Sequence, residues 1–264
     1  MSFEVFDKIY KIEKTIYKSK NSRVSVAICI ENNEKVIVKK IEKNNNNRTK
    51  NRILSEYNIP RLIDCDGIIK TDKYIEDKYN CYLIYQYNPE SISLSGMDYN
   101  NKDYEFFFKI ICQLCDTINK IHDMDFIHRD IKPHNIIVQD TKAYLIDFDL
   151  ACSLTNPKFP IQSKIIGTPN FLAPEIWMYE KNIDYKLADI YSFGVTIYYI
   201  FNKKKFPYKY KTISDIEYGI RHDDPIKCNS GYDYIDDFVM KIIDKNPKNR
   251  PNLDEIKNFF SKLF

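Results

Sequence analysis

The chain has 264 residues, and 44% of them are hydrophobic, which is enough to bury a sizeable core in one large domain or two small ones. Its 40 basic and 37 acidic side chains leave a formal net charge of +3, so the charge balance favours neither a specific nucleic acid nor a membrane as partner. The first residues lack the cleavage site of a signal peptide, and the longest apolar run, Phe193 to Phe201, is too short to span a bilayer. We therefore expect an intracellular protein, in the cytoplasm or the nucleus.

The cysteines point to the same kind of environment. There are 7, an odd number without a repeated spacing, which favours a reducing compartment. Cys112 and Cys115 form a CxxC inside an apolar pattern with helical spacing, which predicts that both pack within a helix. A redox motif or half of a zinc site is the alternative.

The first part of the chain reads mainly as strands. Residues 25–30 and 35–41 are rich in β-branched side chains, and the adjacent asparagines between them suit a tight hairpin. Residues 81–87 predict a further buried strand. Between these strands, residues 49–57 predict one amphipathic helix.

A biased composition is most visible just before that helix. Asparagine, lysine, isoleucine and tyrosine abound, whereas glycine is scarce at 6 residues, a bias expected of an AT-rich genome such as that of a large DNA virus or a protist. Asn44–Asn47 is a low-complexity patch within the basic segment Lys39–Arg52, and it predicts a solvated loop. A nucleic-acid arm is the alternative, but no aromatic residues interleave with those lysines.

From Tyr104 onward the pattern changes to helices. One long helix is expected from Tyr104 to His122, followed by short strands at residues 136–138 and 143–148. Residues 187–201 are apolar nearly all round, which predicts a buried helix.

These elements predict an α+β protein with two lobes. The small β-rich N-lobe would take about residues 1–87 and the larger helical C-lobe about residues 92–264, joined by a hinge at about residues 86–91. Ligands usually bind in clefts between such parts, so we expect the functional site at the junction.

The most informative stretch is IHRDIKPHN, residues 127–135. It resembles the HRDxxxxN catalytic loop of eukaryotic-type protein kinases, and Asp130 and Asn135 have the spacing of that motif. LIDFD follows, in which Asp147 and Phe148 match the metal-binding DFG element apart from its last position. The resemblance thus concerns the residues that carry phosphoryl transfer.

Further elements of the same family occur in its order and at its distances. GTPNFLAPE, residues 167–175, matches the end of the activation segment, and VIVK places Lys39 at the lysine of the third strand. Glu56 lies twelve residues before Ile68 and Ile69, the offset of the carboxylate that pairs with this lysine. The likeness covers nearly the whole chain, so it implies one kinase domain over residues 1–264 with the bilobal kinase fold.

The resemblance also implies structural roles for three further residues. Asp189 would anchor the backbone of the catalytic loop, and Arg250 would pair with the Glu175 carboxylate. His128 would be a packing residue that bonds the backbone rather than a general base.

Phosphoryl transfer depends on positioning and electrostatics, because the protein does little covalent chemistry in it. By resemblance, Asp147 and the amide oxygen of Asn135 would hold Mg²⁺ (or Mn²⁺) on the triphosphate of ATP, since hard cations prefer oxygen ligands. Lys39, held by Glu56, would bind the α and β phosphates.

The same motifs imply the acceptor. Asp130 would act as the catalytic base toward a substrate hydroxyl, and Lys132 would neutralise charge on the γ-phosphoryl group. Lys132 and Thr168 together are typical of the serine/threonine form of the family. Arg129 can receive a phosphorylated activation segment, because arginine binds phosphate well. The hydroxyls within its reach by sequence are Ser153, Thr155 and Ser163.

Residues 81–88 resemble the fifth strand and the hinge, which hold adenine. Tyr85 would be a bulky gatekeeper, and the Gln86 carbonyl and the Asn88 N–H would face the base. The apolar side chains expected to sandwich the base are Val24, Ile37 and Ile137.

The sequence departs from the family at the phosphate loop. Counted back from Val24, the GxGxxG pattern falls on Tyr17, Ser19 and Ser22, so each glycine is replaced. Side chains there restrict the backbone that approaches the phosphates, which predicts weaker or slower handling of nucleotide. We keep these residues and Ile16 as nucleotide contacts. The serine hydroxyls and three nearby cations would compensate; the cations are Lys18, Lys20 and Arg23.

The second departure is Asp149, in place of the DFG glycine. A side chain at this position restricts the backbone flip of inactive kinases, which would keep Asp147 inward. We do not expect Asp149 to bind the metal, because alternate residues of an extended segment point in opposite directions.

Three functions compete at this stage. The leading one is an ATP- and Mg²⁺-dependent protein serine/threonine kinase with a protein substrate. A pseudokinase, a binding scaffold with weak or no turnover, is favoured by the glycine-free loop. A small-molecule kinase related to the choline and aminoglycoside kinases would share the Asp-x4-Asn spacing but generally lacks a segment like GTPNFLAPE.

Overall fold

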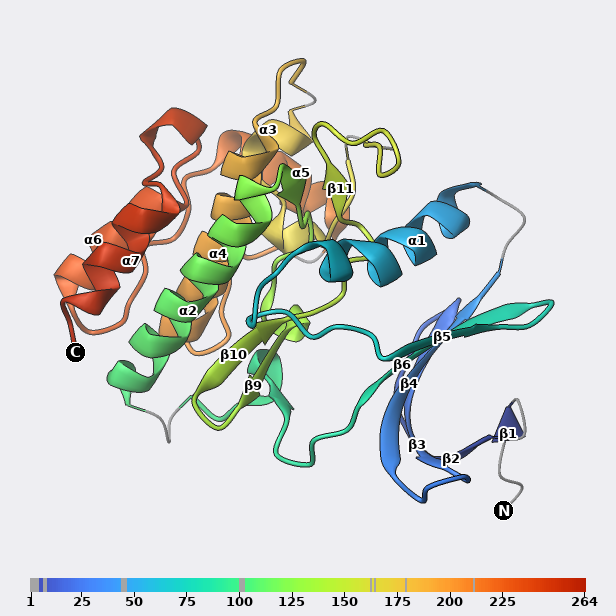
Figure 1. Ribbon diagram of the computed structural model, residues 1–264. Coiled ribbons are helices and arrows are strands. Elements are labelled where there is room, and N and C mark those ends of the chain that lie inside the picture. Colours follow the sequence, from blue (N-terminus) through green and yellow to red (C-terminus); the bar gives the residue numbers. More distant parts are fainter. Residues whose placement is uncertain are drawn as a thin grey trace.

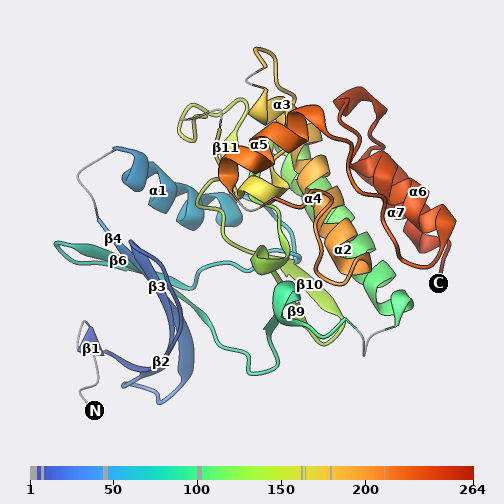
Figure 2. The same ribbon diagram turned by 180° about the vertical axis from the view of Figure 1, so that it is seen from behind.

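The computed structural model shows a β-rich N-lobe beside a larger helical C-lobe (Figures 1 and 2). The small lobe carries a six-stranded sheet and one main helix, and the other long helices belong to the large lobe. This is the α+β, bilobal architecture that the motifs predict. The structure describes residues 5–6, 9–43, 47–99, 103–161, 163, 165–178, 180–210 and 212–264.

The N-lobe sheet is antiparallel throughout, with the strand order β1-β2-β3-β4-β6-β5. Its strands are rich in valine, isoleucine and tyrosine, which fit a pleated, half-buried surface. One face buries a cluster that includes Tyr10, Ala27, Val38 and Ile84. The strands are β1 Val5–Phe6, β2 Tyr10–Lys18, β3 Ser22–Cys29, β4 Lys35–Glu42, β5 Lys73–Glu76 and β6 Asn80–Gln86.

Helix α1 (Asn47–Leu62) lies between the sheet and the C-lobe (Figures 1 and 2). It is longer at both ends than the helix predicted over residues 49–57. Pro60 lies inside it and removes one hydrogen bond, yet the helix continues. Ile59 and Ile63 are fully buried in the core of the C-lobe, and this burial outweighs the missing bond.

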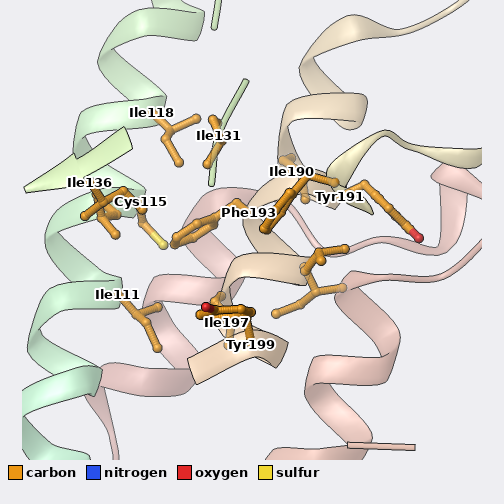
Figure 3. Packing of buried hydrophobic residues seen from close by; sticks show 14 of the residues in the cluster. Ile111, Cys115, Ile118, Ile131, Ile136, Ile190, Tyr191, Phe193, Ile197 and Tyr199 are labelled. Carbon is orange, nitrogen blue, oxygen red and sulfur yellow. The ribbon is translucent and has the colours of Figure 1, made fainter. Parts of the chain in front are cut away.

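The C-lobe is organised around helices α2 (Tyr104–Asp123) and α4 (Tyr185–Phe201). Side chains from the two helices interlock in one core, where Cys115 of α2 lies against Phe193 of α4 (Figure 3). Nearly every residue of α4 is buried, as its continuous apolar sequence predicts. The remaining helices are α3 Pro174–Trp177, α5 Ile213–His222, α6 Asp233–Ile242 and α7 Leu253–Ser261.

Short strands place the two main motifs beside each other. Strand β9 pairs with β10, and β8 pairs with β11, so the loop from β8 to β9 and the loop from β10 to β11 connect the same two strand pairs and lie side by side. These loops are residues 128–135 and 146–151. The short elements are β7 Ile92–Ser93, β8 Phe126–Ile127, β9 Ile136–Gln139, β10 Lys142–Leu145, β11 Cys152–Ser153, and the 3₁₀ turns η1 Leu94–Gly96, η2 Pro133–Asn135, η3 Pro169–Phe171 and η4 Pro247–Asn249.

Several sequence predictions can be compared with this fold. Cys112 and Cys115 pack within α2 as predicted, and all seven cysteines are free thiols. Asn44–Asn46 lie outside the described residues, whereas Asn47 already begins α1. Within the described part of the chain, no helix has the length and apolar character to cross a bilayer.

Candidate active site

Asp189, a buried residue of α4, anchors the catalytic loop. Its carboxylate accepts the backbone N–H groups of His128 and Arg129, both at 2.8 Å, and its Oδ2 lies 3.1 Å from Nε2 of His122. Burial alone would raise the pKa of Asp189, but the hydrogen bond and charge of His122 lower it below the ordinary aspartate value. The predicted anchoring role is confirmed by these bonds.

His128 is fully buried and serves as a spacer between the two motifs. Its Nε2 lies 3.1 Å from the Ile146 carbonyl, and its Nδ1 accepts the Asp130 N–H at 3.3 Å. Its ring meets the Phe148 ring edge to face, with centroids 4.8 Å apart. The imidazole thus joins the catalytic loop to the residue before Asp147, in agreement with the predicted packing role.

Asp130 is held by a closed set of side chains. Lys132 Nζ lies 2.6 Å from its Oδ2, and Thr168 Oγ1 donates to its Oδ1 at 2.7 Å. Lys132 Nζ also donates to Thr168 Oγ1 at 2.7 Å. All three side chains are buried or half-buried. The carboxylate therefore has a fixed orientation, with a cation beside it.

Asn135 is turned so that its amide nitrogen faces Asp130. Nδ2 donates to the Asp130 carbonyl at 2.9 Å and to Oδ2 at 3.0 Å. Because both bonds use the nitrogen, the amide oxygen is the atom that remains for a cation. The Asn135 carbonyl accepts the Ile146 N–H at 2.9 Å, which ties this residue to the Asp147 segment.

Gly167 explains how Thr168 reaches the catalytic loop. Its φ is +132°, and an added Cβ would lie 2.7 Å from the Arg129 carbonyl. A side chain is therefore excluded by both conformation and space. The activation segment can approach the loop this closely only with glycine at this position.

Lys39 of the N-lobe contacts one carboxylate from each lobe. Its Nζ lies 2.7 Å from Glu56 Oε1 of α1 and 2.7 Å from Asp147 Oδ1. Burial would lower the pKa of Lys39, but the Asp147 and Glu56 carboxylates raise it well above the ordinary lysine value. Burial would raise the pKa of Asp147, but Lys39 brings it below its ordinary value. Lys39 and Asp147 are therefore both charged at neutral pH.

Tyr85 adds a second bond to the carboxylate of α1. Its hydroxyl donates to Glu56 Oε1 at 2.9 Å. Burial and the Glu56 charge raise the pKa of Tyr85 well above the ordinary tyrosine value, so the phenol keeps its proton. The predicted gatekeeper thus also fixes Glu56.

The strand register places several predicted nucleotide contacts on one sheet face. Val24 is paired with Lys39, and Ile37 with Tyr85, and directly paired residues point to the same side. Ile37 and Lys39 also share a side because side chains alternate along a strand. Tyr17 is paired with Val24 and joins this face. It is the face from which Lys39 reaches Asp147 of the C-lobe.

The other predicted nucleotide residues lie around this face. Ile16 sits in a β-bulge before Tyr17 and is 55% exposed. Gln86 ends β6, and Asn88 follows it in the connection between the lobes. Ile137 is half-buried in β9, in the C-lobe. The nucleotide roles of these four described residues stay predictions from the resemblance, because no hydrogen bond or ion pair joins them to Lys39, Glu56 or Asp147.

The phosphate loop is closed on itself. The Ser19 N–H donates to the Ser22 carbonyl at 2.8 Å, and the Ser22 N–H donates to Ser19 Oγ at 3.1 Å. The two hydroxyls lie 2.9 Å apart. Both serines thus use these N–H groups within the turn, where the family pattern has glycines whose N–H groups approach phosphate.

The Asp149 carboxylate contacts Arg52 of α1. Its Oδ2 accepts the Arg52 Nε–H at 3.0 Å and also contacts Nη2 of the same guanidinium. Burial and the nearby Asp147 charge raise the pKa of Asp149 above its ordinary value.

Arg129 contacts the activation segment through its guanidinium. Nη2 donates to the Ser163 carbonyl, and the group lies 5.5 Å from the Tyr185 ring centroid. Of the three hydroxyls considered, Ser153 is buried in a turn, where it accepts from Thr155 N and Asn156 N, while Thr155 is exposed. Ser163 meets Arg129 through its backbone carbonyl, and its hydroxyl donates to the Ile165 carbonyl at 3.1 Å.

At the far end of the activation segment, Arg250 and Glu175 form a fully buried pair. Nη1 and Nη2 meet the two carboxylate oxygens at 2.7 and 2.8 Å. Bidentate geometry of this kind holds a carboxylate firmly. The predicted pairing is confirmed.

Comparison with known proteins agrees with this site. The protein kinase domain family model matches residues 10–260. A protein of Acanthamoeba polyphaga mimivirus named "Putative serine/threonine-protein kinase" is 43% identical over 256 residues, 94% of this chain and 92% of that protein. A serine/threonine-protein kinase of Schizosaccharomyces pombe is 32% identical over 214 residues, 77% of this chain and 59% of that protein. The chain belongs to the protein kinase family, in its eukaryotic serine/threonine branch.

Two functional contacts were not predicted. They are the contact of Arg52 with Asp149 and the hydrogen bond from Tyr85 to Glu56. A signal for Arg52 existed, since it precedes Glu56 by four residues and so shares its helix face. The partner of Arg52 could not be predicted from the sequence, because Asp149 is 97 residues away.

Proposed function

We propose that the chain transfers the γ-phosphate of ATP to serine and threonine hydroxyls of a protein substrate. One observation carries the proposal: Asp130 is held in one orientation by Lys132, Thr168 and Asn135, while Lys39, Glu56 and Asp147 form a joined charged group beside it. An oriented carboxylate next to a cation and a pair of cation-binding oxygens is what phosphoryl transfer requires.

The donor atoms fit a divalent cation of the Mg²⁺ type. Asp147 carries a charged carboxylate and Asn135 keeps an amide oxygen, and both are hard ligands. Mg²⁺ commonly takes one or two protein ligands and completes its shell with phosphates and water. When bound, Mg²⁺ or Mn²⁺ would neutralise charge on the triphosphate.

The acceptor chemistry falls to Asp130. Its Oδ1 and Oδ2 are fixed, so it can orient a substrate hydroxyl and take its proton. Lys132 lies against Asp130 Oδ2 and would balance negative charge on the transferred group. Serine and threonine as acceptors are supported by the Lys132–Thr168 pair and by the names of both relatives.

A scaffold with weak turnover is the second candidate, and the phosphate loop favours it. The N–H groups of Ser19 and Ser22 donate hydrogen bonds within the turn, so the loop offers fewer donors to phosphate. The fixed orientation of Asp130 argues for turnover, because a scaffold needs no oriented base.

The setting of this activity is also part of the proposal. We place the protein inside the cell, in cytoplasm or nucleus, as one kinase domain over residues 1–264; seven free thiols support a reducing environment. The mimivirus relative favours the viral alternative for the source of the chain.

The test is incubation of purified protein with labelled ATP, Mg²⁺ or Mn²⁺, and a mixture of basic and acidic protein substrates. Asp130→Asn is the matched control, because it keeps shape and removes the base. We expect label on serine and threonine, reduced about a thousandfold in the variant. Equal label with both proteins would overturn the kinase proposal.

A thermal shift separates the two candidates. ATP with Mg²⁺ should stabilise both the wild type and Asp130→Asn, because binding to the folded state raises the unfolding temperature. Stabilisation without label transfer would identify the scaffold. No stabilisation and no transfer would contradict both candidates.

A further inference from the structure

The Asp149 carboxylate and the Arg52 guanidinium join two elements that are distant in sequence. Arg52 lies on α1, and Asp149 lies at the start of the activation segment. Two guanidinium nitrogens contact one carboxylate oxygen, with Nε at 3.0 Å. The Asp149 side chain is 18% exposed and that of Arg52 43%, so the pair is only partly screened by water.

The two halves of α1 are held by different forces. Ile59 and Ile63, at and just after its C-terminal half, are buried in the C-lobe core. Among the described side chains of the N-terminal half, Ile53 is buried, and it belongs to neither of the two hydrophobic core clusters. Arg52 of this half makes a long-range polar contact, and Glu56 makes another just past the middle of the helix.

These two polar residues act on one face of the helix. Arg52 and Glu56 are four positions apart, so their side chains lie one above the other. Glu56 reaches Lys39 and Arg52 reaches Asp149, while Lys39 itself bonds Asp147. Each of the two helix residues thus contacts the segment that follows β10, Arg52 directly through Asp149 and Glu56 through Lys39 and Asp147.

We propose that Arg52 and Asp149 are positioning residues that hold the N-terminal half of α1 against the activation segment, so that Glu56 stays on Lys39. The effect on catalysis rests on the proposed kinase function, whereas the effect on α1 does not. Glycine at position 149 could not make this contact. The departure from the DFG pattern therefore adds a connection instead of only restricting the backbone.

The charges around the pair sharpen the expectation. Three carboxylates, Glu56, Asp147 and Asp149, face two cations, Lys39 and Arg52. Removing Arg52 alone leaves Asp149 unpaired beside Asp147, which is unfavourable. Removing both partners leaves no unpaired charge, so the double variant should be no worse than Arg52→Ala.

Hydrogen exchange of the α1 amides over residues 48–56 tests the contact directly. The proteins are wild type, Asp149→Asn, Arg52→Ala and the double variant. We expect each single variant to exchange about fivefold faster, and the double variant to match them, since a partly exposed pair contributes about one tenfold factor at most. Lys35→Ala is the control, because it breaks an N-lobe pair to Glu13 at 2.8 Å and should leave α1 unchanged.

Arg52→Lys keeps the charge but loses the second nitrogen, and it should restore most of the protection. It also keeps the test open if Arg52→Ala fails to fold. Unchanged exchange in Asp149→Asn, or additive effects in the double variant, would overturn the proposal.

Catalytic assays complete the test. We expect kcat/KM to fall about fivefold in both single variants, with Arg52→Lys close to the wild type. Faster α1 exchange with unchanged kcat/KM would overturn the catalytic part of the proposal. If the wild type itself transfers no phosphate, the proposed function fails while the exchange data still decide whether the pair holds α1.

Discussion

The catalytic loop and the phosphate loop are held in place in different ways. The catalytic loop is buried and is fixed from outside, by Asp189 below it and by Thr168 beside it. The phosphate loop is largely exposed and is fixed from inside, by the bonds between Ser19 and Ser22. The catalytic loop is thus positioned by residues outside it, whereas the serines of the phosphate loop form hydrogen bonds with each other.

This difference teaches where the chain tolerates change. A buried polar network loses much when one member is removed, because its partners stay unsatisfied. An exposed turn can exchange glycine for serine, since water or a neighbouring side chain replaces each lost bond. The predictions below test this contrast from the largest expected effect to the smallest.

Asp189→Asn should destabilise the protein most. The substituted amide would place its nitrogen near a backbone donor that Asp189 now accepts, costing about 3 kcal/mol of unfolding free energy. Urea unfolding measures this loss. Asp233→Asn is the control, because the Asp233 side chain is 96% exposed, and it should change nothing. A loss below 1 kcal/mol would show that the loop is held in another way.

The same variant has a pH signature. The pKa of Asp189 is lower in the folded protein than in the unfolded chain, so its stabilisation is fully present above the unfolded value of about 3.9 and is lost as pH falls through the folded value. The unfolding free energies of wild type and Asp189→Asn should therefore converge in acid, below about pH 4. A gap that stays constant would contradict this charge assignment.

Thr168→Ala should lower kcat about tenfold, because Asp130 and Lys132 each lose a hydrogen bond to the same hydroxyl. Thr168→Ser keeps that hydroxyl and should recover most of the rate. Steady-state kinetics at saturating ATP separate kcat from KM. A change in the KM for ATP alone would place Thr168 in nucleotide binding instead.

Restoring glycine at Ser19 and Ser22 tests the phosphate loop. Freed backbone N–H groups could approach the phosphates, so the KM for ATP should fall about threefold. The double alanine variant is the control, since it removes the hydroxyls without the freedom of glycine. A higher KM in the glycine variant would mean that the closed turn is itself part of the nucleotide site.

Tyr85→Phe should have the smallest effect, about twofold on kcat/KM, because Glu56 keeps its bond to Lys39. Tyr82→Phe makes a close control, since the Tyr82 hydroxyl also bonds a carboxylate, that of Asp77 at 2.9 Å. Equal losses in both variants would show a general effect on β6 rather than a role for Glu56.

Much of the fold followed from local patterns. The long helix from Tyr104 and the buried helix around Phe193 were expected from their apolar periodicity and found. Other elements were missed because their partners lie far away: β5 is a four-residue strand that depends on β6. Helix α1 passes Pro60 because the C-lobe core buries Ile59, which no local pattern announces.

The sequence by itself determined the family and named the residues that we propose to react, because HRDxxxxN, the DFG-like element and Lys39 are encoded by residue type and spacing. Only the tertiary structure decided how the departures behave. It closes the serines of the phosphate loop on one another and turns Asp149 toward Arg52. The physical reason is that a polar side chain takes its role from its nearest partner, and folding alone chooses a partner 97 residues away.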